Sequence, residues 1–204
     1  MHYHIYNTEA IIIGGRAVSE SSRLIYLFTK DLGLVVARAQ NARALTSKLR
    51  YALDDFSISR VSLVRGKNNW RLTNALPEKN LYKNFQRAPE SRLVFAKAIS
   101  ALRSLVAGEE ANGALYEIVL KVADFIESSE VLNLPEKRSE NAKDIEVILM
   151  LRLLNNLGYF GDHKTFGQFV ADNIWSEAMI QAVRPRRSEA VSVINKSLQA
   201  AGMV

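Results

Sequence analysis

Short apolar segments separated by turn residues dominate the first 80 residues and predict β-strands. Ala10 to Ile13 is a β-branched run that ends at Gly14-Gly15. Residues 56–64 alternate apolar and polar side chains with a period of two, which indicates a strand with one solvent-exposed face. The alternation changes phase at Arg60-Val61, which predicts a β-bulge there.

Similar patterns elsewhere in the first 80 residues predict enough further strands to form a small sheet. We expect three further strands at residues 23–29, 34–37 and 70–75, with Pro77 ending the last of them. Tight turns join most of these strands, and one longer link runs from about residue 40 to 55. Five short strands with this spacing predict a small β-barrel.

Helical periodicity replaces the strand pattern after residue 80. Pro89-Glu90 opens one helix that Gly108 ends, because proline fits the first turn of a helix. The remaining apolar patterns predict helices at residues 115–126, 144–157, 174–183 and 188–201. The helix at 144–157 is apolar on nearly every side, so we expect it at the centre of a bundle, with Gly158 as its C-terminal cap.

These patterns predict an α+β protein of two domains, a five-stranded barrel over residues 1–80 and an α-helical bundle over residues 81–204. We see no internal repeat and no flexible linker, and we therefore expect the barrel to be packed on the bundle. The length of 204 residues and the composition, 48% hydrophobic and 24% charged, are those of a globular protein.

Several compartments and site types are disfavoured by composition. The chain contains no cysteine, which removes disulfides, thiolate zinc sites and iron–sulfur clusters and favours a reducing cytoplasm. No apolar run approaches the ~20 residues that a membrane span needs. The N-terminus lacks the features of a signal peptide, so we expect a cytoplasmic protein with no membrane association.

The positive charge of the chain is concentrated in its first part. Residues 1–80 hold 12 Lys and Arg against 6 Asp and Glu, whereas the rest of the chain holds 15 of each. Arg38 to Arg50 includes four basic residues and no acidic one. A groove that follows nucleic-acid phosphates would have this composition. The alternative is a solvated surface that is merely basic.

The motifs that catalysis requires are missing. Gly14-Gly15-Arg16 lacks the Gly-Lys-Ser/Thr of a phosphate-binding loop. His2 and His4 could bind a metal only from a chain terminus, and Asp54-Asp55 is better explained as a turn or helix-capping pair. We therefore expect no enzyme activity, no cofactor and no metal.

Three segments of the barrel and one of the bundle resemble a known family. Residues 15–34 read GRAVSESSRLIYLFTKDLGL, residues 39–50 read AQNARALTSKLR, and residues 53–56 read LDDF, where proline is usual at Asp55. Residues 151–159 read LRLLNNLGY. Together they resemble the RecO family of bacterial DNA repair proteins, well over residues 9–76 and fairly over 144–162.

The resemblance implies an OB-fold barrel joined to a helical domain. It implies a recombination mediator of the RecF pathway that binds single- and double-stranded DNA, anneals strands and assists recombinase loading on strands coated by single-strand-binding protein. The implied partners are RecR and the C-terminal tail of single-strand-binding protein, in the cytoplasm near the nucleoid. Many members hold a structural zinc with four cysteines after the Leu-Gly-Tyr segment, and this chain has none.

An OB barrel binds strands with basic side chains for phosphates and aromatic rings for bases. We expect stacking from Tyr51 and Trp70, although core packing would explain either ring equally well. Sequence specificity is not expected. The candidate phosphate contacts are Arg16, Arg23, Arg38, Arg43, Lys48, Arg50, Arg60, Arg65, Lys67 and Arg71.

Two further features have alternative explanations. Arg152, inside the apolar helix, needs a buried partner or lines a groove for the tail of single-strand-binding protein. Arg184, Arg186 and Arg187 either extend the DNA path or interact with a helix end. Charge alone would equally suit a general RNA-binding protein, and an OB-like barrel can also serve as a protein-binding adaptor.

Overall fold

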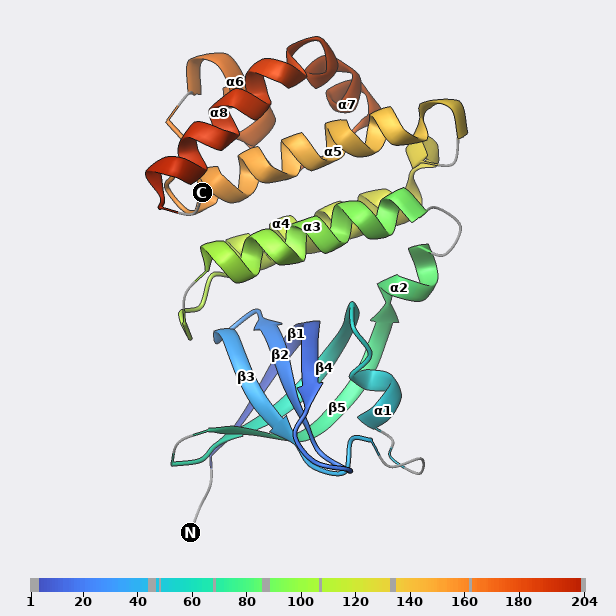
Figure 1. Cartoon of the computed structure of the whole chain (residues 1–204), viewed down its shortest axis with the longest axis vertical. Helices are drawn as coiled ribbons and strands as arrows, with labels where there is room; N and C mark the ends of the chain where they lie inside the picture. The colour runs from blue at the N-terminus through green and yellow to red at the C-terminus, as the bar shows by residue number, and fades with distance from the viewer. Residues whose placement is uncertain are drawn as a thin grey trace. The chain divides into compact units, whose positions relative to one another are not determined.

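A computed structural model describes residues 4–43, 47, 49–67, 69–85, 89–106, 108–132, 135–161 and 163–202. The chain divides into two compact units. The first, here the sheet unit, comprises Met1–Asn84 and Ala107–Gly113, and the second, the helical unit, comprises Phe85–Val106 and Ala114–Val204. An α+β class with a five-stranded N-terminal sheet and a helical C-terminal part is thus confirmed (Figure 1).

The sheet closes on itself in the order β1-β2-β3-β5-β4, with β4 pairing back onto β1 (Figure 1). All pairs are antiparallel except β3 with β5. This is a five-stranded barrel in which closure removes the free sheet edges. The strands are β1 (Ile5–Ala17), β2 (Arg23–Thr29), β3 (Gly33–Ala39), β4 (Ser57–Arg65) and β5 (Trp70–Asn80).

The prediction that Pro77 ends the last strand is wrong, because β5 continues to Asn80. The β4–β5 register shifts between Ile58 and Ser59, so that Pro77 pairs with Ser59 beside the irregularity. A proline lacks the N–H that a regular ladder needs, and bulges are among the places where a sheet accepts it.

The predicted bulge at Arg60-Val61 is also wrong. Residues 59–62 of β4 pair without interruption, and the register shifts lie on either side of them. The phase of the pattern changes because serines replace apolar residues on the buried side. The Ser59 hydroxyl, fully buried, donates to the carbonyl of Ala52 at 2.7 Å, which satisfies the polar group.

The loop at 108–112 belongs to the sheet unit and fastens one end of the barrel. Trp70, 4% exposed, packs in the barrel core and donates from its indole Nε1 to Glu109 Oε1 at 2.8 Å. Glu109 Oε2 accepts from Arg65 Nη1 at 2.8 Å. The N–H of Leu34 donates to the carbonyl of Gly108 at 3.1 Å. One carboxylate therefore ties both strands of the β4–β5 hairpin, next to its turn, to this loop.

The helical unit is built around one long helix, α5, which contacts α3, α6, α7 and α8. This confirms its predicted central position, although α5 begins at Pro135, nine residues before the predicted start. Gly158, with φ of 79°, ends the helix as predicted, and the N–H of Tyr159 donates to the carbonyl of Leu154 at 2.9 Å. The main helices of the unit are α3 (Pro89–Leu105), α4 (Gly113–Ser128), α5 (Pro135–Asn156), α6 (His163–Val170), α7 (Glu177–Val183) and α8 (Arg187–Ala200).

A buried carboxylate joins α5 to the start of α8. Asp144 is fully buried, and its two oxygens accept from Arg184 Nε at 2.9 Å and Arg187 Nε at 2.7 Å. Arg187 also donates to Glu140 at 2.7 Å, one turn before Asp144. A buried charge needs such partners, because its desolvation alone costs several kcal/mol. Arg184 and Arg187 therefore have a structural role in the helical unit.

None of the helices in the described ranges combines the length and the apolar character that crossing a bilayer requires.

We predict that Glu109→Ala lowers the free energy of unfolding by about 1–2 kcal/mol, because the Trp70 N–H and the Arg65 guanidinium lose their shared acceptor. Urea denaturation followed by circular dichroism measures this. Glu110→Ala is the matched control, since the neighbouring Glu110 side chain is exposed. Equal stability of the two variants would show that the Glu109 contacts contribute nothing.

Stability should also depend on pH through Glu140. Hydrogen bonds from Lys143 and then Arg187 lower the pKa of Glu140 from 4.5 to about 2. A depressed folded-state pKa stabilises the fold above the unfolded value, and this contribution is lost as the pH falls from about 4.5 to 2. Urea denaturation across this range should show a weaker pH dependence for Glu140→Gln than for Glu136→Gln, a change on the exposed first turn of α5. Identical dependence of stability on pH in the two variants would contradict this contribution of Glu140.

Candidate nucleic-acid interface

A row of side chains crosses the outer face of the barrel from strand to strand. Arg16 on β1 pairs with Leu24 on β2, Leu24 pairs with Arg38 on β3, and Arg38 pairs with Arg71 on β5. Directly paired residues point to the same side of a sheet, and their neighbours in each strand point to the other. The buried neighbours Ile25, Ala37 and Leu72 face inward, so the row faces solvent. We call Arg16, Leu24, Arg38 and Arg71 the arginine row.

The arginines of this row are exposed, whereas Leu24 is half-buried. Among the described residues, Arg16 and Arg38 form no ion pair. Neighbouring strands lie about 4.8 Å apart. Arg38 and Arg71 are direct partners on β3 and β5, so their side chains leave the same face of the sheet from adjacent positions.

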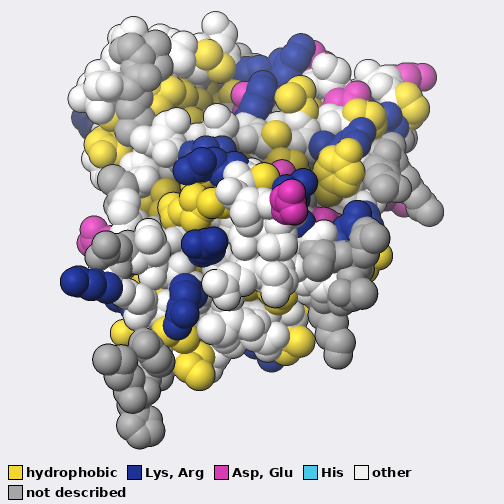
Figure 2. Space-filling model, turned by 60° about the horizontal axis from the view of Figure 1, so that its bottom comes forward, with side chains coloured by type: hydrophobic (Ala, Val, Ile, Leu, Met, Phe, Trp, Pro, Cys, Tyr) yellow, Lys and Arg dark blue, Asp and Glu magenta, His cyan; other side chains and the backbone are white. Residues whose placement is uncertain are grey.

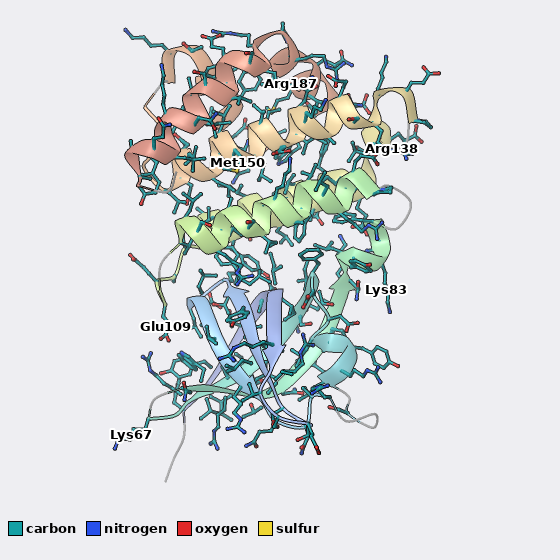
Figure 3. All side chains as sticks on the ribbon, in the orientation of Figure 1. Lys67, Lys83, Glu109, Arg138, Met150 and Arg187 are labelled. Carbon is teal, nitrogen blue, oxygen red and sulfur yellow. The ribbon has the colours of Figure 1, made fainter. Side chains whose placement is uncertain are left out.

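Two loops extend this surface beyond the row. Arg43 lies against the β1–β2 loop, donating from its backbone N–H to Ser21 O and from Nη1 to Ser19 O, both at 3.1 Å. Lys67 extends from the tip of the β4–β5 hairpin (Figure 3). In OB-type barrels these two loops and the β2–β3 face form the usual strand-binding surface.

An apolar row lies next to the arginine row. Tyr26 on β2, half-buried, pairs with Val36 on β3, which is 45% exposed. Tyr26 was not among the predicted stacking residues. Its position two residues after Leu24 on a recognisable strand was the sequence signal that could have identified it, because side chains at that spacing share a face.

Three predicted phosphate contacts already interact with carboxylates. Arg23 lies 3.7 Å from Asp55 and donates to the carbonyl of Leu53. Arg60 pairs with Glu78, and Arg65 pairs with Glu109. The charge of these arginines is neutralised locally, which leaves less of it for a polyanion. Figure 2 shows Lys and Arg side chains separated by uncharged surface on the face turned forward.

The two predicted aromatic contacts have different environments. Trp70 is a core residue, as its 4% exposure and its edge contact with Tyr6 at 5.1 Å show, so no base can stack on it in this structure. Tyr51 on α1 (Leu49–Ala52) is 65% exposed, and the amine of Lys83 lies 5.9 Å from its ring centroid. Arg50 beside it is exposed. The remaining predicted contact, Lys48, lies outside the described residues.

Arg152 has the buried partners that its position required. It is 2% exposed and donates to the carbonyls of Phe169 at 2.8 Å and Ile174 at 2.7 Å. Its guanidinium also lies 4.5 Å from the ring centroid of Trp175. Burial lowers the pKa of Arg152 to about 10, and Asp172 partly offsets this effect. These contacts support the structural explanation of Arg152.

Arg186 likewise interacts within the helical unit, with Glu189 and the carbonyl of Thr165. Arg184 and Arg187 are bound to Asp144, so all three arginines of this group interact with other residues of the helical unit. Within the described parts of the chain, no three His, Cys, Asp or Glu side chains come close enough to hold a metal ion.

Comparisons with known proteins agree on one family. A family model described as "Recombination protein O N terminal" matches residues 1–79. The DNA repair protein RecO of Dehalococcoides mccartyi is 29% identical over 125 residues, which cover 61% of this chain and 49% of that protein. RecO of Caldanaerobacter subterraneus is 30% identical over 127 residues, covering 61% and 50%.

A shorter match supports the same assignment. RecO of Synechocystis is 36% identical over 70 residues, covering 34% of this chain and 26% of that protein. The chain therefore spans about half the length of the first of these relatives, and the family model covers β1 to β4 and β5 as far as residue 79. Residues 1–79 are thus similar to the N-terminal part of RecO DNA repair proteins, and the chain contains no cysteine.

Proposed function

We propose that this protein is a non-enzymatic DNA-binding mediator of repair and recombination, which binds single strands across the outer face of its barrel. The observation that carries the proposal is the arginine row, because it places three exposed guanidinium groups on one face of the sheet. The similarity of residues 1–79 to the N-terminal part of RecO proteins supports the role in repair.

Binding on this surface would be electrostatic and independent of sequence. Guanidinium groups contact phosphate oxygens, which carry no base information. Arg43 and Lys67 would continue the path from the row onto the two adjoining loops. Half-buried Tyr26 would offer apolar contact to sugars beside the row. Affinity would therefore depend on strand length and ionic strength more than on sequence.

Double-stranded DNA binding, strand annealing and recombinase loading on coated strands belong to the same proposal. So do RecR and the C-terminal tail of single-strand-binding protein as partners, and a place in the RecF pathway near the nucleoid. These functions rest on the family relationship of a chain that spans about half of its relatives. The barrel accounts physically for the DNA-binding part of the proposal.

The first test is the salt dependence of binding to single-stranded DNA. The doubly substituted Arg16→Gln, Arg38→Gln protein should show a log–log salt slope smaller by about 1.4, since each lost phosphate contact removes about 0.7. Fluorescence anisotropy with a labelled oligonucleotide, from low to moderate salt, measures the slope.

Arg60→Gln is the matched control for this experiment. Arg60 is also an exposed barrel arginine, but its charge is paired with Glu78. We expect its substitution to change the slope by much less than 0.7. A flat salt response of the unsubstituted protein, or an equal effect of Arg60→Gln and Arg38→Gln, would overturn the arginine row as the binding surface.

Strand annealing distinguishes DNA repair from the two alternatives, a general RNA-binding protein and a protein-binding adaptor. Complementary labelled DNA strands should anneal faster with the protein, also when single-strand-binding protein coats them, and the Arg16→Gln, Arg38→Gln protein should lose most of this acceleration. Faster annealing of RNA than of DNA would favour the RNA-binding alternative. No acceleration of either would favour the adaptor.

A further inference from the structure

A second group of basic and aromatic side chains belongs to the sheet unit. Its residues lie on two short helices, whereas those of the arginine row lie on strands. The group comprises Arg50 and Tyr51 on α1 and Tyr82 and Lys83 on α2 (Leu81–Asn84). Tyr51 is 65% exposed and Tyr82 is 47% exposed. The amine of Lys83, labelled in Figure 3, lies near the Tyr51 ring. We call these four residues the tyrosine cluster.

Both short helices that carry the tyrosine cluster are anchored to the barrel. Ala52 and Leu53, next to Tyr51, are fully buried in the barrel core, and Ala52 O accepts from Ser59. Leu81, next to Tyr82, is also fully buried, and its N–H donates to the carbonyl of Phe56 at 3.2 Å. The exposed tyrosines therefore project from fixed backbone, which lowers the entropic cost of binding a ligand on them.

The α2 helix also has its own N-terminal hydrogen bond. The Asn80 side chain accepts from the N–H of Lys83 at 2.9 Å, which fixes the direction in which the lysine leaves the backbone. The Lys83 amine then lies 5.9 Å from the centroid of the Tyr51 ring. A cation near the ring is also available to a phosphate next to a base that stacks there.

The charge around the cluster favours an anionic ligand. Arg50 is exposed and makes no ion pair within the described part of the chain. The nearest acidic residues in sequence are Asp54, which is half-buried, and Asp55, which lies 3.7 Å from Arg23. Aromatic rings with neighbouring cations are the arrangement that binds unpaired bases together with their phosphates.

We propose that the tyrosine cluster is a base-stacking site for single-stranded nucleic acid, with one unpaired base on Tyr51 and the adjoining phosphates at Arg50 and Lys83. This inference rests on the proposed function. It adds a contact whose contribution to affinity depends on the presence of a base. The arginine row provides only phosphate contacts. The two surfaces thus predict separable properties, a base-dependent affinity and a salt-dependent affinity.

The test compares an oligo-dT strand with an abasic strand of the same length. The unsubstituted protein should bind oligo-dT at least about fivefold more tightly, since stacking on an aromatic ring contributes about this much or more. Tyr51→Leu should remove this preference with little change in the salt slope, and Tyr51→Phe and Tyr51→Trp should retain it. The fluorescence of Tyr51→Trp should be quenched further by oligo-dT than that of the unsubstituted protein.

Tyr159→Leu is the control, because Tyr159 is a 41% exposed tyrosine of the helical unit. It should leave both the base preference and the salt slope unchanged. Unfolding midpoints should agree among all variants, since the substituted rings are exposed, and Tyr51→Phe gives a second comparison should Tyr51→Leu unfold.

The outcomes separate this inference from the function on which it rests. Salt-dependent binding with no preference for oligo-dT, or a preference that Tyr51→Leu retains, would overturn the stacking site and leave the arginine row intact. Absence of binding to either strand would overturn the proposed function together with the stacking site. A protein ligand on the cluster would give the first result.

Discussion

Closure of the barrel through the β1–β4 and β3–β5 pairs determines which side chains face solvent. In a closed sheet every strand has two partners, so the inward or outward direction of one residue fixes that of its neighbours on all five strands. Ile25, Ala37 and Leu72 fill the interior, and this places the arginines beside them in sequence outside. The basic surface is in this sense a consequence of core packing.

The sequence allowed most elements to be predicted, because local patterns determine them. The strands at 23–29 and 57–65 and the central helix follow from hydrophobic period, and Gly158 follows from the need for a positive φ at the helix end. The errors arose where contacts between residues far apart in the sequence determine the local structure. Ser59 of β4 is fully buried, and its hydroxyl donates to the carbonyl of Ala52 in α1. Strand β5 continues past Pro77, where its register with β4 shifts.

The basic character of the candidate site was predictable from the sequence, but the individual residues that form it were not. Ten basic residues in one segment indicated the interface, yet charge counting does not show which arginines are already paired. Arg65 is paired by Glu109, which lies 44 residues later in the chain. The same carboxylate accepts from Trp70 and so turns a predicted stacking ring into a core residue. Tyr82 and Lys83 were missed because a four-residue helix has no detectable period.

The 107–113 segment also constrains how the protein can be divided. The chain passes from one unit to the other after residues 84, 106 and 113, so the sheet unit is not encoded by one continuous stretch. A gene fragment ending at the last strand would omit the acceptor for the buried indole. A chimaera joined after β5 would keep the acceptor of the Trp70 N–H only if the other parent supplied a loop like residues 107–113. We therefore expect the two units to be exchanged between homologues together and not separately.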